Sequence, residues 1–376
     1  MAVDIETAMH PMMLLAAAAF SQSQCCHRSS SFAKHVVKYS TRAMATSSKD
    51  DIIDDGIKRS GGESNGKRFF DMEQRNWEQG FKAYDQGFGP LTRQTISTLL
   101  SDGGFSPSNV VDDCQFKLLD VATGPGFVLT AAIDAAMKLD LPEEADANFQ
   151  FTGLDITQNF LQLAKHRIDA QLQEQEQEHQ NKRQFNIDFV EGSAESLPFD
   201  DGSFDSIVCN FGILHFFHPD KFLRESYRVL RPGGRLSFSA WAPPTSTEGF
   251  RIALESIAEV GNPNVEGLPD GPNFFDFGDP NQATNALNEV GFVDTKSVEL
   301  SEMKWTSIKN GSELYDVLLQ GTSRTREILL GQTEEDSKAI ASLMISKYDE
   351  ITDSGKHCLA MPALITSGRK PISREC

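Results

Sequence analysis

The sequence is poor in cysteine, tyrosine and tryptophan, lacks a long apolar run, and has fewer bases than acids. Its six cysteines show neither Cys-x-x-Cys pairs nor zinc-like spacing with histidine, which disfavours a disulfide framework and a metal site. No run of about eighteen apolar residues occurs, so we expect no integral membrane segment. The net charge of −19, from 35 Lys and Arg against 54 Asp and Glu, argues against binding nucleic acid or an anionic membrane through phosphate groups.

The first 49 residues differ in charge from the rest of the chain. No acid occurs from Thr7 to Lys49, whereas five bases and many serines and threonines do, so residues 1–49 carry +3 when Asp4 and Glu6 are counted. This composition is typical of an organelle transit peptide, and the alternative is a disordered tail. A transit peptide would lead to a plastid or a mitochondrion, and without one we expect a cytoplasmic protein.

A linker and one α/β domain are predicted after this segment. Residues 50–68 contain the glycine- and serine-rich stretch Ser60–Gly66 and are predicted to be a linker. Over residues 69–370, short apolar runs alternate with helix-like segments, which predicts a doubly wound, mostly parallel sheet with helices on both faces. Five strands are expected in the core, at residues 117–122, 149–156, 187–190, 206–210 and 235–241. Helices are expected at 127–139, from 157, from 219, and later at 281–291, 312–330 and 333–352, with further strands at 295–300 and 357–366.

Acidic residues and glycines stand where the first two strands end, the edge at which such sheets bind ligands. Asp120 is followed by a bend containing Gly124 and Gly126, where the backbone can approach a ligand closely. Asp155 ends the second strand, where a carboxylate can accept hydrogen bonds from both hydroxyls of a ribose; the alternative is a cap for the next helix. Leu129 stands where a dinucleotide-binding fingerprint needs its third glycine, which disfavours a dinucleotide.

Three motifs occur in a specific order, namely Asp120–Gly126, Glu191–Asp205 and Arg228–Leu236. Together they resemble class I S-adenosylmethionine-dependent methyltransferases, and within them the type-11 methyltransferase domain group, which includes ubiquinone and menaquinone C-methyltransferases. The motifs lie in the cofactor-binding core, residues 117–241, about a third of the chain. The resemblance implies a Rossmann-like seven-stranded sheet with an antiparallel last strand between strands five and six. It also implies helical lid insertions in the C-terminal part, residues 242–370.

The resemblance also implies how S-adenosyl-L-methionine would be held at the first two strands. Asp120 would hold the amino group of the cofactor, and Asp155 its ribose. The backbone of Ala122, Gly124 and Gly126 would cradle the methionine part. Ala122 replaces the first glycine of the family, a change that a backbone contact tolerates.

The remaining cofactor contacts are implied in the same way. Ile156 would pack on the adenine face, with Ala194 at the adenine edge. Ser193 stands where the family usually has an Asp for the adenine amino group, so we expect adenine binding to rely on backbone groups. Asn210 would line the methyl-transfer side. Tyr84, in a segment that resembles the helical N-terminal flap of the family, would either cover the cofactor or be a core aromatic.

Two histidines follow the fourth strand, close to the expected transfer site. A general base is needed only if the acceptor loses a proton, so for His215 this role competes with positioning or packing. His218 precedes Pro219 and is predicted to cap the next helix. Phenylalanines are abundant in the lid, residues 242–279, as at Phe274–Phe277. They predict an apolar or aromatic acceptor pocket, or else pack the lid against the sheet.

These features predict an enzyme, an S-adenosylmethionine-dependent methyltransferase acting on a small, apolar or aromatic acceptor. Two alternatives stay open. One is a nicotinamide-dependent oxidoreductase, disfavoured by Leu129 and by the run Leu197–Asp205. The other is a non-catalytic, methyltransferase-like protein that acts through a partner. Neither the acceptor atom nor the oligomeric state follows from the sequence.

Overall fold

The computed structural model describes residues 58–105, 115–139, 148–178, 184–353 and 358–372. The predicted transit peptide and the first part of the predicted linker lie outside these residues. Within the described ranges, no helix is long and apolar enough to cross a membrane.

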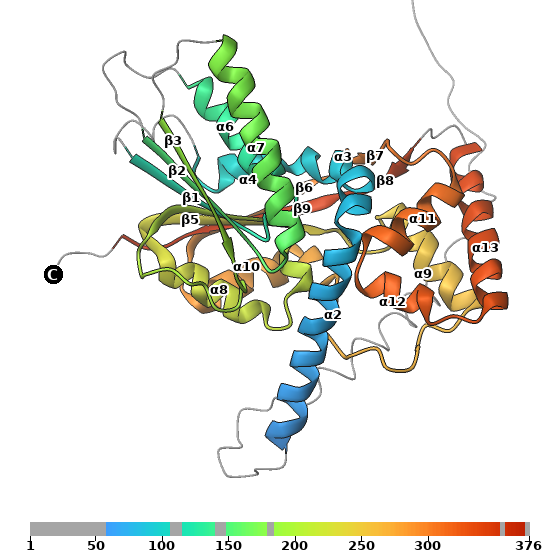
Figure 1. Ribbon diagram of the computed structural model, residues 1–376. Coiled ribbons are helices and arrows are strands. Elements are labelled where there is room, and N and C mark those ends of the chain that lie inside the picture. Colours follow the sequence, from blue (N-terminus) through green and yellow to red (C-terminus); the bar gives the residue numbers. More distant parts are fainter. Residues whose placement is uncertain (1–57, 106–114, 140–147, 179–183, 354–357, 373–376) are drawn as a thin grey trace, which may run out of the picture. The chain divides into compact units, whose positions relative to one another are not determined.

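Seven strands form the central sheet in the order β3-β2-β1-β4-β5-β9-β6 (Figure 1). Neighbouring strands are parallel except at β9, which runs antiparallel between β5 and β6. The predicted fold class, including the position of the antiparallel strand, is therefore confirmed. The strands are β1 Gln115–Val121, β2 Asn148–Asp155, β3 Gln184–Glu191, β4 Phe204–Asn210, β5 Leu230–Trp241, β6 Val293–Leu300 and β9 Ala363–Arg369.

The central strands are apolar along their length because helices cover both faces of the sheet. Leu118 and Leu119 are neighbours on β1, point to opposite faces, and are both fully buried. On one face lie α4 Ile96–Asp102, α6 Phe127–Met137 and α7 Gln158–Glu178, and on the other α8 Pro219–Val229 and α10 Pro280–Val290 (Figure 1). The right-handed connections leave the carboxyl ends of β1, β2 and β4 together at one edge.

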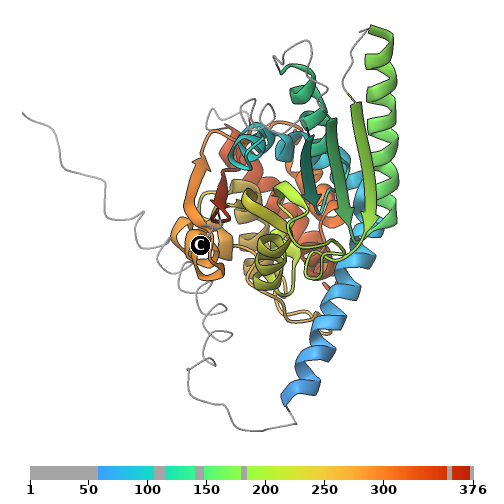
Figure 2. The same cartoon turned by 90° about the vertical axis from the view of Figure 1, so that its left-hand side faces the viewer.

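A long helix, α2 Lys58–Gly87, passes this edge beside the start of α7 (Figures 1 and 2). It leads into α4 through α3 Gly89–Thr92 and η1 Arg93–Thr95. The prediction of a linker over Ser60–Gly66 is wrong, because this stretch is helical. Contacts with a distant loop support a helix that glycine-rich composition disfavours: the Asn65 side chain donates to the carbonyl of Asp270 (3.0 Å), and Arg68 donates to that of Gly267 (2.9 Å).

A group of C-terminal helices lies against the other side of α2: α9 Glu248–Val260, α11 Gly311–Gly321, α12 Arg324–Leu330 and α13 Glu334–Asp353. The single helix predicted over 312–330 is two helices, broken after Gly321. At that glycine α11 approaches α2 so closely that a Cβ would lie 3.1 Å from the backbone nitrogen of Tyr84. Thr333 caps α13, with its hydroxyl oxygen accepting from the Asp336 nitrogen (3.1 Å). α9, in the lid, was not predicted.

The predicted closing strand, 357–366, is interrupted at Met361–Pro362. Its first part, β8 Leu359–Ala360, pairs with β7 Lys304–Trp305 in a separate two-stranded sheet, and its second part is β9. Proline has no N–H to donate to a sheet, and the carbonyl of Pro362 instead accepts from the Ala242 nitrogen (3.1 Å). The first residue of the prediction, His357, lies outside the described ranges.

Candidate functional site

The loop between β1 and α6 bends through three residues with positive φ: Ala122 (56°), Gly124 (52°) and Gly126 (81°). A Cβ placed on Gly126 would lie 2.8 Å from that of Ala164, so glycine there lets α6 and α7 pack. A Cβ on Gly124 would meet nothing nearer than the carbonyl oxygen of Ala122, at 4.0 Å. The open space beside Gly124 allows a ligand to approach the backbone.

Asp120, at the end of β1, is a fully buried acid with one unsatisfied oxygen. Its Oδ2 accepts from the Thr123 hydroxyl (2.7 Å), whereas Oδ1 has no hydrogen-bond partner among the described residues. Burial, with a smaller effect from the charge of Asp155, raises the pKa of Asp120 to about 7. Because an orphaned buried oxygen is costly, a donor on a bound ligand would gain a strong contact here.

Asp155, at the end of β2, is 6% exposed and links the loops around it. Its Oδ2 accepts from the Gly124 nitrogen (2.9 Å), and its Oδ1 accepts from the nitrogen (3.1 Å) and hydroxyl (2.9 Å) of Thr157. Burial raises its pKa to about 6, although these hydrogen bonds favour the carboxylate. Asp155 therefore makes contacts at the start of α7, which agrees with the alternative role of a helix cap. It also contacts the glycine bend.

The predicted adenine residues lie beside this acid pair. The Gly192 nitrogen donates to the Asp155 carbonyl (2.9 Å), which joins the ends of β2 and β3. Ala194 is buried, and the Ser193 hydroxyl oxygen accepts from the Glu195 nitrogen (3.2 Å). Ile156 is partly exposed, and its carbonyl accepts from the Gln74 side chain (3.0 Å). Helix α2 is thus bonded to the edge that carries the adenine candidates.

Tyr84 of α2 lies within an aromatic cluster next to the acids. Its ring stacks on Phe88 (5.7 Å between centroids) and meets Trp77 (5.5 Å) and Phe160 (5.8 Å) edge to face. Burial raises the pKa of the Tyr84 phenol to about 12, and the charges of Asp155 and Asp120 add to the shift. The side chain is therefore a core aromatic that also lies within electrostatic range of both acids.

Asn210, at the end of β4, is engaged with the protein itself. Its Oδ1 accepts from the hydroxyls of Thr95 and Ser239 (2.7 Å each), and its Nδ2 donates to the carbonyl of Thr92 (3.1 Å). The amide that was predicted to line the transfer side thus ties the segment before α4 to β4 and β5. The next residue, Phe211, has a φ of 58° and stacks on Trp241 (4.0 Å), a strained position that no sequence motif indicated.

His215 lies on η2 Ile213–His215, in the loop that follows β4. Its Nδ1 is 3.1 Å from Oε2 of Glu73, an α2 carboxylate whose side chain is 3% exposed. The Trp77 indole donates to the same oxygen (2.8 Å), and its ring meets the His215 ring edge to face (4.9 Å). His215 was identified from the sequence, but Glu73 and Trp77 were not. The only indication of a role for them was that the neighbouring segment resembles the helical N-terminal flap of the family.

His218 stands at the position before α8, as predicted, but its side chain makes no capping hydrogen bond. The lid phenylalanines divide between the two predicted roles, which are packing against the sheet and lining an acceptor pocket. Phe277 packs edge to face on Phe238 of β5 (5.5 Å), so it joins the lid to the sheet. Phe274 instead faces His215 (5.6 Å) and Phe250 (5.6 Å), so it contributes to an aromatic wall near the histidine.

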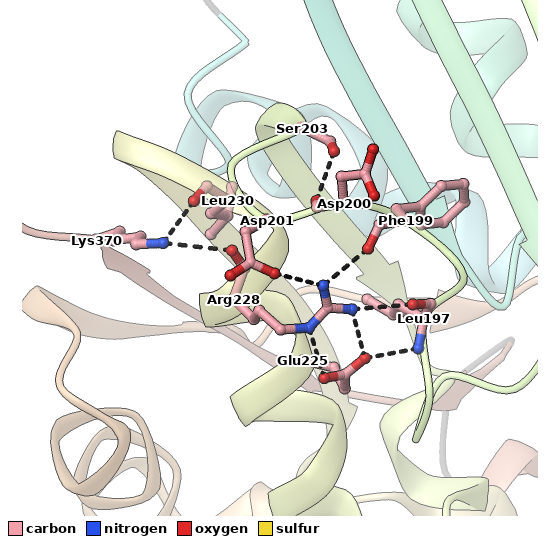
Figure 3. A network of polar contacts seen from close by, with 9 residues as sticks. All are labelled: Leu197, Phe199, Asp200, Asp201, Ser203, Glu225, Arg228, Leu230 and Lys370. Atoms are coloured by element: carbon pink, nitrogen blue, oxygen red, sulfur yellow. Dashed lines mark hydrogen bonds and ion pairs between the residues drawn. The ribbon is translucent and has the colours of Figure 1, made fainter.

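The third motif builds a polar network around Arg228 of α8 (Figure 3). Its guanidinium donates to the carbonyls of Leu197 (3.0 Å) and Phe199 (2.8 Å), and to the carboxylates of Glu225 and Asp201. Glu225 in turn accepts from the Leu197 nitrogen (2.8 Å). The network therefore holds the loop that follows Ser193 and Ala194 against α8.

Comparisons with known proteins agree with this geometry. A family model described as "Methyltransferase domain" matches residues 119–238. The chain is 36% identical over 155 residues to the ubiquinone/menaquinone biosynthesis C-methyltransferase UbiE of Rhodopseudomonas palustris, with 40% of this chain and 53% of that protein covered. It is 35% identical over 130 residues to the demethylmenaquinone methyltransferase of Deinococcus radiodurans, with 35% and 45% covered. The chain thus spans about half the length of these relatives.

Among solved structures, the chain is similar to phosphoethanolamine N-methyltransferase 2 of Haemonchus contortus in complex with S-adenosyl-L-methionine. The identity is 18% and the TM-score 0.43, and the match covers 81% of this chain and 60% of that chain.

Proposed function

Because the chain contains a class I S-adenosylmethionine-dependent methyltransferase domain, we propose that it transfers a methyl group from S-adenosyl-L-methionine to a small, apolar or aromatic acceptor. One observation carries the proposal. The unsatisfied Oδ1 of Asp120 lies in the same loop system as the open backbone at Gly124 and the Asp155 carboxylate. Such a site offers a hydrogen-bond acceptor for an ammonium group and space for the methionine chain. It also offers a second hydrogen-bond acceptor for the two hydroxyls of a ribose.

The residues fit the methionine and ribose parts of the cofactor. Asp120 would accept from the amino group, and the backbone of Ala122, Gly124 and Gly126 would lie along the methionine chain. Oδ2 of Asp155, which holds the Gly124 nitrogen, has further lone pairs for a ribose hydroxyl. A cationic ligand would also favour the ionised form of both acids.

The adenine would pack on Ile156, with Ala194 and Ser193 at its edge and Tyr84 covering the site from α2. Asn210 would act indirectly, because its contacts with Thr92, Thr95 and Ser239 would hold the loop that follows β4 in place. The cofactor supplies a methyl group already activated by a sulfonium. The work of the protein is then to align the acceptor and to exclude water.

Aromatic side chains support an apolar or aromatic acceptor. Trp77 of α2 and Phe274 of the lid meet the His215 ring, and Phe250 packs on Phe274. Such aromatic surfaces favour flat, apolar ligands. The names of the two relatives refer to quinone methylation, which agrees with such an acceptor. The match to the family model, residues 119–238, lies within the cofactor-binding core and does not extend into the lid.

Calorimetric titration with S-adenosyl-L-methionine tests the proposal. We expect Asp155→Ala to weaken binding more than tenfold, because the ribose hydroxyls lose their acceptor. Asp220→Asn, which alters an exposed acid on α8, is the matched control and should bind like the wild type. Equal affinity in wild type and Asp155→Ala would refute the assignment. Wild-type protein incubated with cell extract and methyl-labelled donor would then identify the acceptor by the mass of the labelled product.

A further inference from the structure

We propose that Glu73 is a positioning residue that orients His215 as the general base of the transfer, so that the acceptor is a molecule that gives up a proton. This inference rests on the proposed methyltransferase function and adds the chemical class of the acceptor. It assigns a task to a buried carboxylate that lies outside the three sequence motifs.

The geometry distinguishes the two nitrogens of the His215 ring. Nδ1 lies 3.1 Å from Oε2 of Glu73, and an ionised carboxylate only accepts hydrogen bonds, so the neutral ring must carry its hydrogen on Nδ1. Nε2 makes no hydrogen bond with any residue that the structure describes. The nitrogen that is left with a lone pair is therefore the one without a protein partner, as a base requires.

Glu73 is itself held in one orientation. The Trp77 indole, four residues along α2, donates to the same Oε2 (2.8 Å). The adjacent turn of α2 is anchored at both sides, since Gln74 donates to the carbonyl of Ile156 (3.0 Å) and Asn76 to the carboxylate of Glu327 (2.9 Å). A carboxylate fixed in this way restricts the His215 ring more than packing alone would.

The position of His215 suits a base for methyl transfer. The His215 nitrogen donates to the carbonyl of Gly212 (2.9 Å). A Cβ on Gly212 would lie 2.6 Å from that of Ala122, so the loop after β4 packs directly on the loop that would hold the methionine part. The rings of Trp77 and Phe274 flank the imidazole and limit access of water to it.

Few other charges face the pair. Glu195 and His218 lie on the same side of the sheet as Glu73 and His215, and Glu195 accepts a hydrogen bond from the His218 nitrogen (3.0 Å). Arg324, at the start of α12, donates to the carbonyl of Pro269 (3.0 Å); burial lowers its pKa, and the negative charges of Glu73 and Asp270 act against this shift. Glu73 is the carboxylate that contacts the imidazole directly, so its removal should affect His215 most.

The proposed step moves one proton and one methyl group. The proton of the acceptor passes to Nε2 of His215, while the electron pair that it leaves forms the new bond to the methyl carbon. The bond from that carbon to sulfur breaks, and its electrons stay on sulfur. The imidazolium, stabilised by Glu73, later releases the proton to water. Acceptors with a hydroxyl or an acidic C–H fit this step, whereas thioethers and tertiary amines, which lose no proton, do not need it.

Nitrogen NMR of the full-length protein labelled in histidine tests the positioning without any acceptor. At pH 8.5, with the His215 signal assigned from the spectrum of His215→Gln, we expect a protonated Nδ1 and a bare Nε2. In Glu73→Leu the ring should shift toward the other tautomer, while His218→Gln, the matched control, leaves the His215 signal unchanged. A protonated Nε2 in the wild type, or the same tautomer in Glu73→Leu, would overturn the proposal.

Kinetics separate positioning from a structural role. The reaction is measured with methyl-labelled S-adenosyl-L-methionine and the acceptor fraction of a cell extract. We expect Glu73→Gln to lower the maximal rate at least tenfold with cofactor affinity within twofold of the wild type, and Glu73→Asp to recover part of the rate. The wild-type rate should rise with pH as the base loses its proton, and this rise should vanish in His215→Gln and be displaced in Glu73→Gln.

A wild-type rate and pH profile in Glu73→Gln would contradict the inference even if the methyltransferase activity is real. Failure of the wild type to bind the cofactor would instead contradict the proposed function, and the NMR result would still decide how the His215 ring is oriented.

Discussion

Two polar clusters beside the sheet differ in how their charges are satisfied. Around Arg228, the charged groups of Arg228, Glu225 and Asp201 are paired, and hydrogen bonds from Arg228 hold the pKa of Glu225 below its usual range (Figure 3). In the acid pair, burial raises the pKa of Asp120 and Asp155 to about 7 and about 6. The pairs around Arg228 are complete within the protein, whereas the acid pair leaves Oδ1 of Asp120 without a partner among the described residues. Such unsatisfied, perturbed groups mark ligand sites more often than completed networks do.

The largest effect on stability should come from breaking the completed cluster. In Arg228→Met, the carbonyls of Leu197 and Phe199 and the Glu225 carboxylate lose their donor. We expect the free energy of unfolding to fall by about 2 kcal/mol, as for the loss of several hydrogen bonds to a charged group. Urea denaturation measures this. Arg228→Lys should recover only part of the loss, because an ammonium cannot make the forked contacts; a loss below about 0.5 kcal/mol in the Met variant would show that the network is dispensable.

A smaller effect is expected from titrating the acid pair. Both acids have a folded-state pKa above the unfolded value of 3.8, so the folded protein binds more protons at intermediate pH. The stability of the ligand-free protein should therefore decrease as the pH rises from about 4 to about 7.

Thermal denaturation at each pH measures this dependence, and two comparisons make it specific. Asp120→Asn should flatten it, and saturating S-adenosyl-L-methionine should cancel it, because the cationic cofactor favours the ionised acids. Stability that rises with pH across this range in the ligand-free protein would contradict the argument.

The smallest effect concerns an orphaned group that faces no ligand. The hydroxyl of Ser226 is buried in α8, two residues before Arg228, and has no partner among the described residues. Ser226→Ala should raise the free energy of unfolding by about 0.5 kcal/mol, since it removes an unsatisfied group and improves helix propensity. Cofactor affinity should stay unchanged in calorimetry. A stabilised Ser226→Ala that also loses cofactor affinity would show that the two clusters are coupled.

Much of the fold and of the cofactor edge could be predicted from local patterns. Apolar runs and turn residues located the core strands to within a few residues, because a strand buried on both faces must be apolar. Parallel pairing then required the residues after β1, β2 and β3 to meet at one edge. Asp120, Gly124, Asp155 and Ser193 are therefore neighbours for a reason that is visible in the sequence, although their roles toward the cofactor stay predictions.

Contacts between distant segments could not be predicted in this way. The start of α2 is helical in a stretch that local composition assigns to a linker, and α11 ends at Gly321 because α2 crosses it there. Asn210, expected to face the ligand, is held by Thr92, Thr95 and Ser239. In each case a tertiary contact overrides a local preference worth about 1 kcal/mol or less per residue.

The sequence by itself determined the doubly wound sheet and the residues that follow β1 and β2 at its carboxyl edge, because periodicity and turn chemistry are local properties. Only the tertiary structure decided which oxygen of the acid pair stays unpaired, and that Glu73 meets His215. Those facts depend on where α2 crosses the strand ends. That crossing is set by the packing of side chains far apart in the chain, which no local pattern encodes.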